Sequence, residues 1–291
     1  MQTSLLTKVF NGCNLETACK LTAEAGYDAV ELMGREPHLG PETSIEEAEG
    51  LREYLDELEL EVSCLASYTG NYANREKSEA DREAELTALD HYCDLAVALD
   101  CDLIRHNPGG PAEHHATTAD YERAASWLQR AADRAAEDDL RLGVEIHSST
   151  IVESSTTAVD LFERIERDNI CAIHDAGNMY ISDVPYGPTS VATLGEWLGH
   201  VHVKDEVRIS DPDAYGAFEI ETTNGEETFR PCLLGTGGAD HGPLFTALQE
   251  QEYDGALTAE CHLPPHATLD PLAIATHERA TVEDLWIADN E

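Results

Sequence analysis

Short apolar runs alternate with longer amphipathic stretches along almost the whole chain. The short runs are typical of strands, whereas the longer stretches repeat their apolar positions at helical spacing, most clearly over Glu76–Leu99 and Asp120–Glu137. The predicted strands are Leu5–Phe10, Ala29–Met33, Val62–Ala66, Leu103–Asn107, Leu142–His147, Ile170–Asp175, His200–Lys204 and Ala256–Glu260. Because each of these strands is followed by a helix, the pattern predicts an α/β fold, a single (β/α)8 TIM barrel, rather than an open doubly wound sheet.

Local signals at the ends of these elements agree with this organisation. Asn14, Ser44 and Thr118 stand where helix N-caps are expected. No Pro-, Gly- or Ser-rich linker divides the chain, so we expect one domain over residues 1–291. No GxGxxG motif follows the first strand, which argues against a dinucleotide-binding fold.

One segment departs from the regular alternation. Val207–Arg230 is acidic, contains Gly216 and Gly225, and shows no clear period. It is longer than most loops in compact domains. We therefore expect an irregular insert after the seventh strand, either an active-site flap or a mobile loop.

The charge of the chain is extreme and changes how its acidic residues are interpreted. Asp and Glu number 58 against 18 Lys and Arg, a formal net charge of -40, and the acids are spread over the whole length. This excess opposes binding to nucleic acid or to an anionic membrane. The composition resembles that of proteins from salt-accumulating, halophilic archaea, because molar salt screens charges beyond about 3 Å. A single Asp or Glu therefore carries little functional weight by itself.

The remaining composition favours a cytoplasmic protein. No apolar run is long enough to span a membrane, and no signal-peptide pattern opens the chain. The eight cysteines are scattered without a CxxC pair, so reduced thiols are expected. This composition is compatible with a homo-oligomer.

Candidate chemistry gathers where the predicted strands end, which is where the active sites of such barrels lie. Four strand ends carry polar groups, in the motifs LGVEIH, CAIHDAGN, HVHVKDE and ALTAECH. Glutamate is rare in apolar strand segments unless it is paired or bound to a metal. Carboxylates together with imidazole suit one divalent ion, Mn²⁺, Co²⁺ or Mg²⁺, better than a cysteine-rich zinc site.

Alternation assigns these side chains to faces of their strands. His200, His202 and Lys204 share one face, and the valines between them suit the helix-facing side, so the histidines are predicted to point into the barrel. Asp175 then points inward and His174 outward. The same rule groups Glu145 with Gly143 and His147, and Glu260 with Ala256 and Thr258. For Arg105 and His106 alternation does not decide which one points inward.

The ordered motifs resemble the xylose isomerase-like TIM barrels, also called the sugar phosphate isomerase/epimerase superfamily. The resemblance begins with LETACKLTAEAGYDAVEL, continues through GVEIHSST, HDAGN and HVHVKDE, and closes with GTGGADHGPLFTALQEQEYDGALTAE. It implies one divalent metal ion bound by Glu145, Asp175, His202 and Glu260, which are spaced by 30, 27 and 58 residues. It also implies that Glu145 and Glu260 act as catalytic base and acid.

Further roles follow from the same resemblance. His200 would not bind the metal itself but would orient a ligand carboxylate by a hydrogen bond. Arg208 stands six residues after His202, where ketose 3-epimerases of this family carry a substrate-binding Arg. Those enzymes carry His three residues after the ligand Asp, whereas this chain has Asn178, which favours the broader isomerase and inositol-catabolism branches over strict ketose 3-epimerases. The expected substrate contacts are Arg208, Lys204, Asn178, Glu31 and His147.

The resemblance implies a metal-dependent sugar or sugar phosphate isomerase or epimerase that works through an enediolate, with a small-molecule sugar as its partner. A dehydratase of a keto-inositol or sugar acid would use the same ligands and expel a hydroxyl. A noncatalytic sugar-binding barrel is a third alternative. A phosphodiesterase of the endonuclease IV type is disfavoured by the net charge and by the single ligand set.

Overall fold

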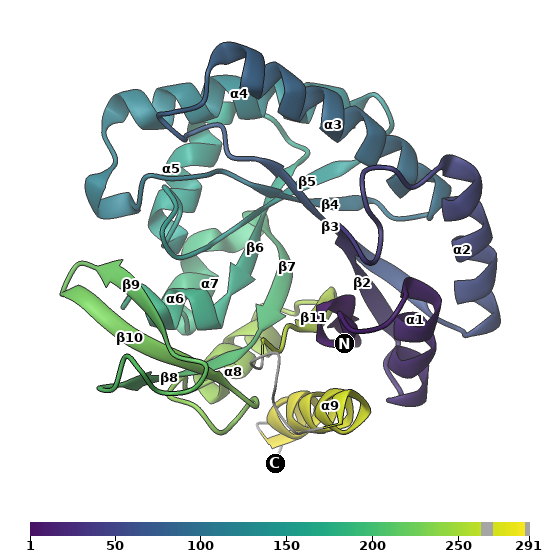
Figure 1. The fold of residues 1–291 in the computed structure, drawn as a ribbon. Helices are drawn as coiled ribbons and strands as arrows, with labels where there is room; N and C mark the ends of the chain where they lie inside the picture. The colour runs from purple at the N-terminus through teal and green to yellow at the C-terminus, as the bar shows by residue number, and fades with distance from the viewer. Residues whose placement is uncertain (263–269, 289–291) are drawn as a thin grey trace.

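The computed structural model describes residues 1–262 and 270–288 (Figure 1). Eight parallel strands close into a barrel in the order β1, β11, β7, β6, β5, β4, β3, β2, which confirms the predicted (β/α)8 fold. These strands are β1 (Gln2–Leu6), β2 (Ala29–Gly34), β3 (Glu61–Gly70), β4 (Leu103–Asn107), β5 (Arg141–Glu145), β6 (Ile170–Asp175), β7 (Leu198–Val203) and β11 (Ala256–Ala259).

Helices surround the barrel and bury the apolar outer faces of its strands (Figure 1). They are α1 (Leu15–Glu24), α2 (Ile45–Glu57), α3 (Glu79–Ala98), α4 (Thr118–Ala136), α5 (Ser155–Ile165), α6 (Ala176–Ile181), α7 (Pro188–Leu194), α8 (Gly242–Glu250) and α9 (Pro271–Ala288). Short 3-10 turns lie at Thr7–Phe10, Glu113–His115 and Gly195–Trp197. Among the described residues, none of these helices has the length and apolarity to cross a membrane.

The ends of the first strand and of one helix differ from the predictions. Leu5–Phe10 is not one strand, because β1 ends at Leu6 and the chain then tightens into a 3-10 turn. Gln2 to Leu5 pair with β11, so the strand register begins earlier than the apolar run indicated. Asn14 and Ser44 are N-caps as predicted, whereas the predicted cap Thr118 is wrong, since Thr117 forms the capping box with Asp120.

The prediction of an irregular insert after the seventh strand is wrong, because this segment folds into an antiparallel sheet. Its strands are β8 (Asp205–Ile209), β9 (Phe218–Thr222) and β10 (Gly225–Cys232), in the order β8, β10, β9. Phe218 stacks on the buried Phe229, and Thr223-Asn224 forms the tight turn between β9 and β10. The sheet lies beside α6, so it stands next to the carboxyl ends of the barrel strands (Figure 1).

Candidate functional site

Four predicted ligands meet inside the barrel. Glu145 ends β5, Asp175 ends β6, His202 lies in β7, and Glu260 directly follows β11. Each offers one ligand atom, and these atoms all lie within 4.8 Å of one another. The four residues are at most 2% exposed. Parallel pairing produces this convergence, since His202 is aligned with Asp175 on one side and with Thr258 of β11 on the other.

The Nδ1 atom of His202 provides the test of whether a metal fits. Nδ1 is buried and has no hydrogen-bond partner in the described part of the chain. It lies 3.5 Å from Glu260, 3.7 Å from Glu145 and 3.8 Å from Asp175. These distances exceed ordinary hydrogen bonds but suit donors that share one cation. Three carboxylates and one imidazole therefore fit a divalent ion.

The protonation of His202 depends on these three carboxylates and on a fourth, Glu31. Burial alone would lower the pKa of His202, but Glu31 and the three ligand carboxylates raise it well above its ordinary value. The proton that His202 holds offsets negative charge that water cannot reach. A cation at Nδ1 would take the place of this proton, because metal ligands must be deprotonated.

Glu31 lies beneath the ligands rather than in the cavity. Its carboxylate is fully buried and lies 3.0 Å from His202 Nε2 and 2.9 Å from His200 Nε2. Burial alone would raise the pKa of Glu31, but the two histidines lower it. An ionised carboxylate only accepts, so His202 donates from Nε2 and its Nδ1 faces the other ligands. Glu31 was predicted to contact substrate, but in the structure it contacts both histidines. His200 was predicted to support the metal ligands, and it bonds to Glu31 rather than to a ligand carboxylate.

Two cations stand against the ligand carboxylates. Arg105 Nη1 lies 3.4 Å from Glu145 and 3.9 Å from Glu260, and Lys204 Nζ lies 3.0 Å from Glu260 and 2.8 Å from Asp175. Burial alone would raise the pKa of both glutamates, but Arg105 lowers the pKa of Glu145 and Lys204 lowers that of Glu260. Both glutamates are therefore carboxylates at neutral pH, as a ligand or a base requires.

Arg105 is a site residue that the sequence left undecided. It is aligned with Gly143 of β5, which shares the inward face with Glu145, whereas His106 lies against Thr69 on the other side. A buried Arg in an apolar strand is rare. That rarity, together with the register to β5, is the signal that identifies it.

Asn178 bridges two ligands at the start of α6. Asp175 caps this helix by accepting from the Asn178 backbone N–H at 2.8 Å. The Asn178 side-chain amide donates to Asp175 at 3.0 Å and to Glu145 at 3.3 Å. Asn178 thus holds both carboxylates, and it also lines the cavity above them.

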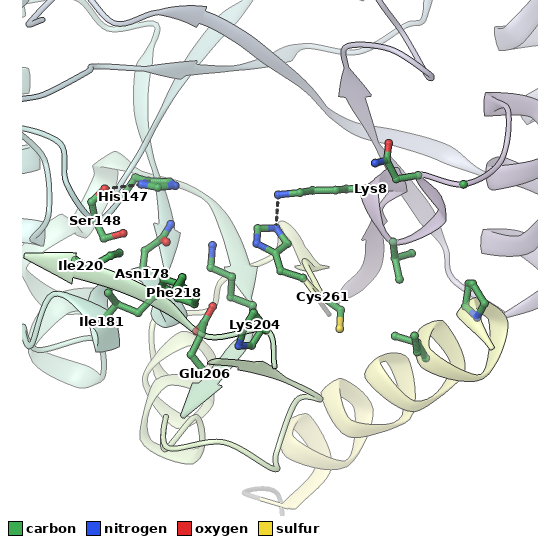
Figure 2. A pocket seen from close by; sticks show the side chains of 18 residues that line it. Lys8, His147, Ser148, Asn178, Ile181, Lys204, Glu206, Phe218, Ile220 and Cys261 are labelled. Carbon is green, nitrogen blue, oxygen red and sulfur yellow. Dashed lines mark hydrogen bonds between the residues drawn. The ribbon is translucent and has the colours of Figure 1, made fainter. Parts of the chain in front are cut away.

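A cavity of about 840 Å³ lies next to the ligands, since two residues that line it, Asn178 and Lys204, bond to Asp175 and Glu260. Figure 2 shows this cavity. Lys204, Asn178 and His147 face it from the β5–β7 side, while Lys8 reaches into it from the opposite side. Residues of the inserted sheet also line it, among them Phe218 and Ile220. The cavity therefore combines a polar floor, next to the ligands, with a partly apolar wall.

Lys8 is a second site residue that the sequence did not reveal. Its Nζ lies 2.8 Å from His262 Nε2, which lies 2.9 Å from Glu260 Oε1. Burial lowers the pKa of Lys8 to about 8, although Glu260 opposes this shift. The chain has four lysines, and two of them, Lys8 and Lys204, line this cavity.

Arg208 does not join the other predicted residues. Its side chain is 41% exposed, lies 3.2 Å from Glu227 on β10, and packs over the ring of Phe229. Three residues earlier on the same strand, Asp205 accepts from the backbone N–H groups of Gly235 and Gly237 at 3.0 and 2.8 Å. The backbone N–H groups of the GTGG turn, Gly235–Gly238, therefore bind a carboxylate of the protein itself.

Comparison with known proteins agrees with this architecture. The profile of the family described as "Xylose isomerase-like TIM barrel" matches residues 19–284. A curated relative, "Inosose dehydratase" of Lacticaseibacillus casei, is 26% identical over 154 residues, which are 52% of this chain and 50% of the relative. The chain thus spans about half the length of the curated relatives it matches.

Solved structures with the same fold cover nearly the whole chain. An L-ribulose 3-epimerase superposes with a TM-score of 0.78 at 18% identity, covering 99% of this chain and 95% of its own. The IOLI protein, whose structure contains "a binding zinc atom", has a TM-score of 0.78 at 16% identity and covers 99% of both chains. With the family profile extending over most of its length, the chain belongs to the xylose isomerase-like TIM barrel family.

Proposed function

We propose that the chain is a divalent-metal-dependent enzyme that moves a proton next to the carbonyl of a sugar or sugar phosphate, as an isomerase or epimerase. The observation that carries this proposal is the buried set of Glu145, Asp175, His202 and Glu260, in which an imidazole nitrogen without a hydrogen-bond partner among the described residues faces three carboxylates. A divalent ion held by these residues would polarise the substrate carbonyl and stabilise the negative charge developing on its oxygen.

Glu145 and Glu260 are the proposed base and acid. They come from strands separated in the barrel by β6 and β7, so they reach the same point from different sides. Both are carboxylates at neutral pH, so either one can accept the proton on the carbon beside the carbonyl. A glutamate becomes the acid only after it has taken up a proton, either from the substrate or from water, which it then returns to carbon. Arg105 lies close to both and would hold their orientation while the proton moves.

The polar floor of the cavity suits a polyhydroxylated substrate. Lys204, Asn178 and His147 point into it from one side, and Lys8 from the other (Figure 2). Amide, imidazole and ammonium groups are donors that bind hydroxyl, carbonyl and phosphate oxygens. We therefore retain Lys204, Asn178 and His147 as substrate contacts and add Lys8.

Dehydration of a keto-inositol is the second candidate. The curated relatives that support it are named inosose dehydratase, at 22–26% identity over about half of their length. The first chemical step is the same in both reactions, removal of a proton beside a carbonyl. The reactions differ only in whether that proton returns to carbon or a hydroxyl then departs.

The experiment is a substrate screen read by NMR in deuterated water. Pentoses, hexoses, their phosphates and an inosose are each incubated with the protein and Mn²⁺, Co²⁺ or Mg²⁺ in molar KCl, a salt concentration chosen for the net charge of -40. We expect metal-dependent deuterium incorporation beside the carbonyl of at least one substrate, loss of this incorporation with EDTA, and recovery on adding metal. Incorporation that persists in EDTA, or binding without exchange over the whole panel, would contradict the proposal.

A further inference from the structure

Glu206 is a buried carboxyl that the proton transfer described above does not use. It lies in β8, is 3% exposed, and lines the cavity together with Lys204 and Asn178 (Figure 2). Its Oε2 atom has no hydrogen-bond partner among the described residues. Buried carboxyl oxygens nearly always have partners, because an oxygen removed from water without a replacement hydrogen bond destabilises the fold. An unpaired oxygen at a cavity wall therefore suggests a partner supplied by a ligand.

The surrounding chain is built to hold this carboxyl in place. Gly177 lies in α6 opposite Glu206, and a Cβ atom at Gly177 would lie only 2.5 Å from Glu206 Oε2. The same Cβ would also collide with the stem of Lys204. Glycine at this position thus lets both side chains pass between α6 and β8 to reach the cavity. The β8 strand fixes the backbone of Glu206, which is paired with Pro231 of β10.

The charges around Glu206 favour its protonated form. Lys204 is bonded to Asp175 and Glu260, and among the described residues no ion pair joins it to Glu206. Asp175, Glu260 and Asp205 add negative potential. Burial, followed by these carboxylates, raises the pKa of Glu206 to about 8, although Lys204 opposes the shift. Glu206 therefore carries a proton at neutral pH, in contrast to the ionised Glu145 and Glu260.

We propose that Glu206 is the acid that protonates a hydroxyl leaving from the carbon two bonds from the substrate carbonyl, so that this site can catalyse water loss from a β-hydroxy ketone. The proposal rests on the proposed function for its first step only, the removal of a proton beside the carbonyl. It adds a third carboxyl with a separate role, next to the pair that exchanges the proton at carbon.

The step balances as an elimination. Glu145 or Glu260 takes the proton from the carbon beside the carbonyl, and the electron pair of that C–H bond forms the enediolate. When the carbonyl forms again, a C=C bond forms between this carbon and the next, and the C–O bond of the departing hydroxyl breaks. The proton of Glu206 joins that hydroxyl to give water. Glu206 is left as a carboxylate and regains a proton from solvent, while the base releases the one it took. No oxidant or reductant is required.

The test compares two rates in one NMR experiment in deuterated water, with the Mn²⁺-loaded protein and an inosose as the probe. Deuterium incorporation beside the carbonyl reports proton removal, and the alkene signal of the product reports water loss. Glu206→Gln should slow water loss by about 10²-fold or more, the usual contribution of a general acid. The same substitution should slow deuterium incorporation far less, so that the rate of deuterium incorporation divided by the rate of water loss rises by at least tenfold. Glu206→Asp, which keeps an acid, should recover part of the lost rate.

Two further measurements separate a lost acid from a damaged fold. Glu219→Gln changes an exposed carboxyl on β9 of the same sheet and should leave both rates as in the unmodified protein. The infrared spectrum of the unmodified protein at neutral pH should contain a band of a protonated carboxyl group, and subtracting the spectrum of Glu206→Gln should show that this band is lost in the variant. Equal slowing of both rates, or an unchanged rate of water loss in Glu206→Gln, would overturn the proposal, as would deuterium incorporation without any water loss in the unmodified protein. Absence of deuterium incorporation in the unmodified protein would instead contradict the proposed function.

Discussion

The barrel interior and the inserted sheet both face the same cavity, but they position their side chains by different means. Inside the barrel, Asp175 and His202 end or line strands that are paired on both sides, and each is completely buried. The sheet is paired only within itself, as β8, β10 and β9, and its Arg208 and Glu219 are exposed. Rigid parallel strands hold charges together that would repel one another, whereas an inserted sheet can vary the cavity wall without disturbing them. We therefore expect the chemistry to depend on the barrel and the choice of reaction to depend on the insert.

The first prediction tests the barrel side of this comparison and has the largest expected effect. Glu145→Gln and Glu260→Gln each remove a carboxylate that is both a proposed ligand and a proposed base or acid. Each should lower the rate of deuterium incorporation by about 10³-fold, within the range for general acid–base catalysis. NMR in deuterated water measures this rate, and circular dichroism should show an unchanged fold.

Glu163→Gln is the matched control, because this exposed residue lies on α5, directly after the β5 strand that carries Glu145. It should behave as the unmodified protein does. Full activity of either Glu145→Gln or Glu260→Gln would mean that the carboxylate pair does not carry the proton.

The second prediction concerns the support beneath the ligands. Glu31→Gln replaces the carboxylate that accepts from His202 Nε2, so the ring loses the charge that orients it. The affinity for Mn²⁺ should fall about 10–100-fold, as is usual for groups that orient metal ligands. Isothermal titration calorimetry measures this affinity, with the exposed Glu53→Gln on α2 as the control. An unchanged affinity would show that His202 is held by packing alone.

The third prediction concerns the attachment of the insert to the barrel. Leu234 follows β10, and its backbone N–H donates to the fully buried Glu278 of α9 at 3.0 Å. Burial raises the pKa of Glu278 to about 7 in the folded protein. Between its ordinary pKa of 4.5 and pH 7 the unfolded chain loses this proton while the folded chain keeps it, so the free energy of unfolding should fall as the pH rises. The loss should be on the order of 3 kcal/mol and complete once the pH exceeds about 7.

Glu278→Gln should remove this part of the pH dependence, since the amide oxygen still accepts from Leu234 but does not titrate. Urea unfolding of the variant and of the unmodified protein at several pH values measures the difference. Asp284→Asn, an exposed change on the same helix, should keep the dependence of the unmodified protein. Parallel curves for Glu278→Gln and the unmodified protein would contradict the prediction.

The same contrast explains how much could be predicted from the sequence. Alternation gave the inward side of Glu145, Asp175 and His202 correctly, because a strand that is buried on both faces leaves only two choices. It could not choose between Arg105 and His106, which are consecutive, polar and both buried. That choice depends on the register to β5, which a single strand does not contain.

The missed residues have physical reasons of their own. Lys8 was included in a strand that in fact ends at Leu6, so its position in the turn above the barrel was not foreseen. Glu206 stands in the HVHVKDE motif, but no local pattern there shows that a further strand, β8, begins at Asp205 shortly after β7. The strands of the inserted sheet are recognisable mainly from the Asn-Gly pair at 224–225, where the turn meets β10. The depth of Glu31 below the cavity depends on its distance from β7 across the barrel, which no local pattern encodes.

The last prediction has the smallest expected effect and tests the insert side of the comparison. Arg208 was predicted to bind substrate, but its side chain is 41% exposed and paired with Glu227 on the same sheet. Because Arg208 is held by Glu227 and does not contact the ligands, Arg208→Ala should leave kcat/KM nearly unchanged. Steady-state kinetics on the substrate found by the screen measures this, with the exposed Arg230→Ala of β10 as its matched control. A tenfold rise in KM for Arg208→Ala alone would mean that Arg208 leaves Glu227 and turns toward the substrate. The inserted sheet would then have to move when substrate binds. The barrel and the sheet would differ in mobility as well as in how they position their side chains.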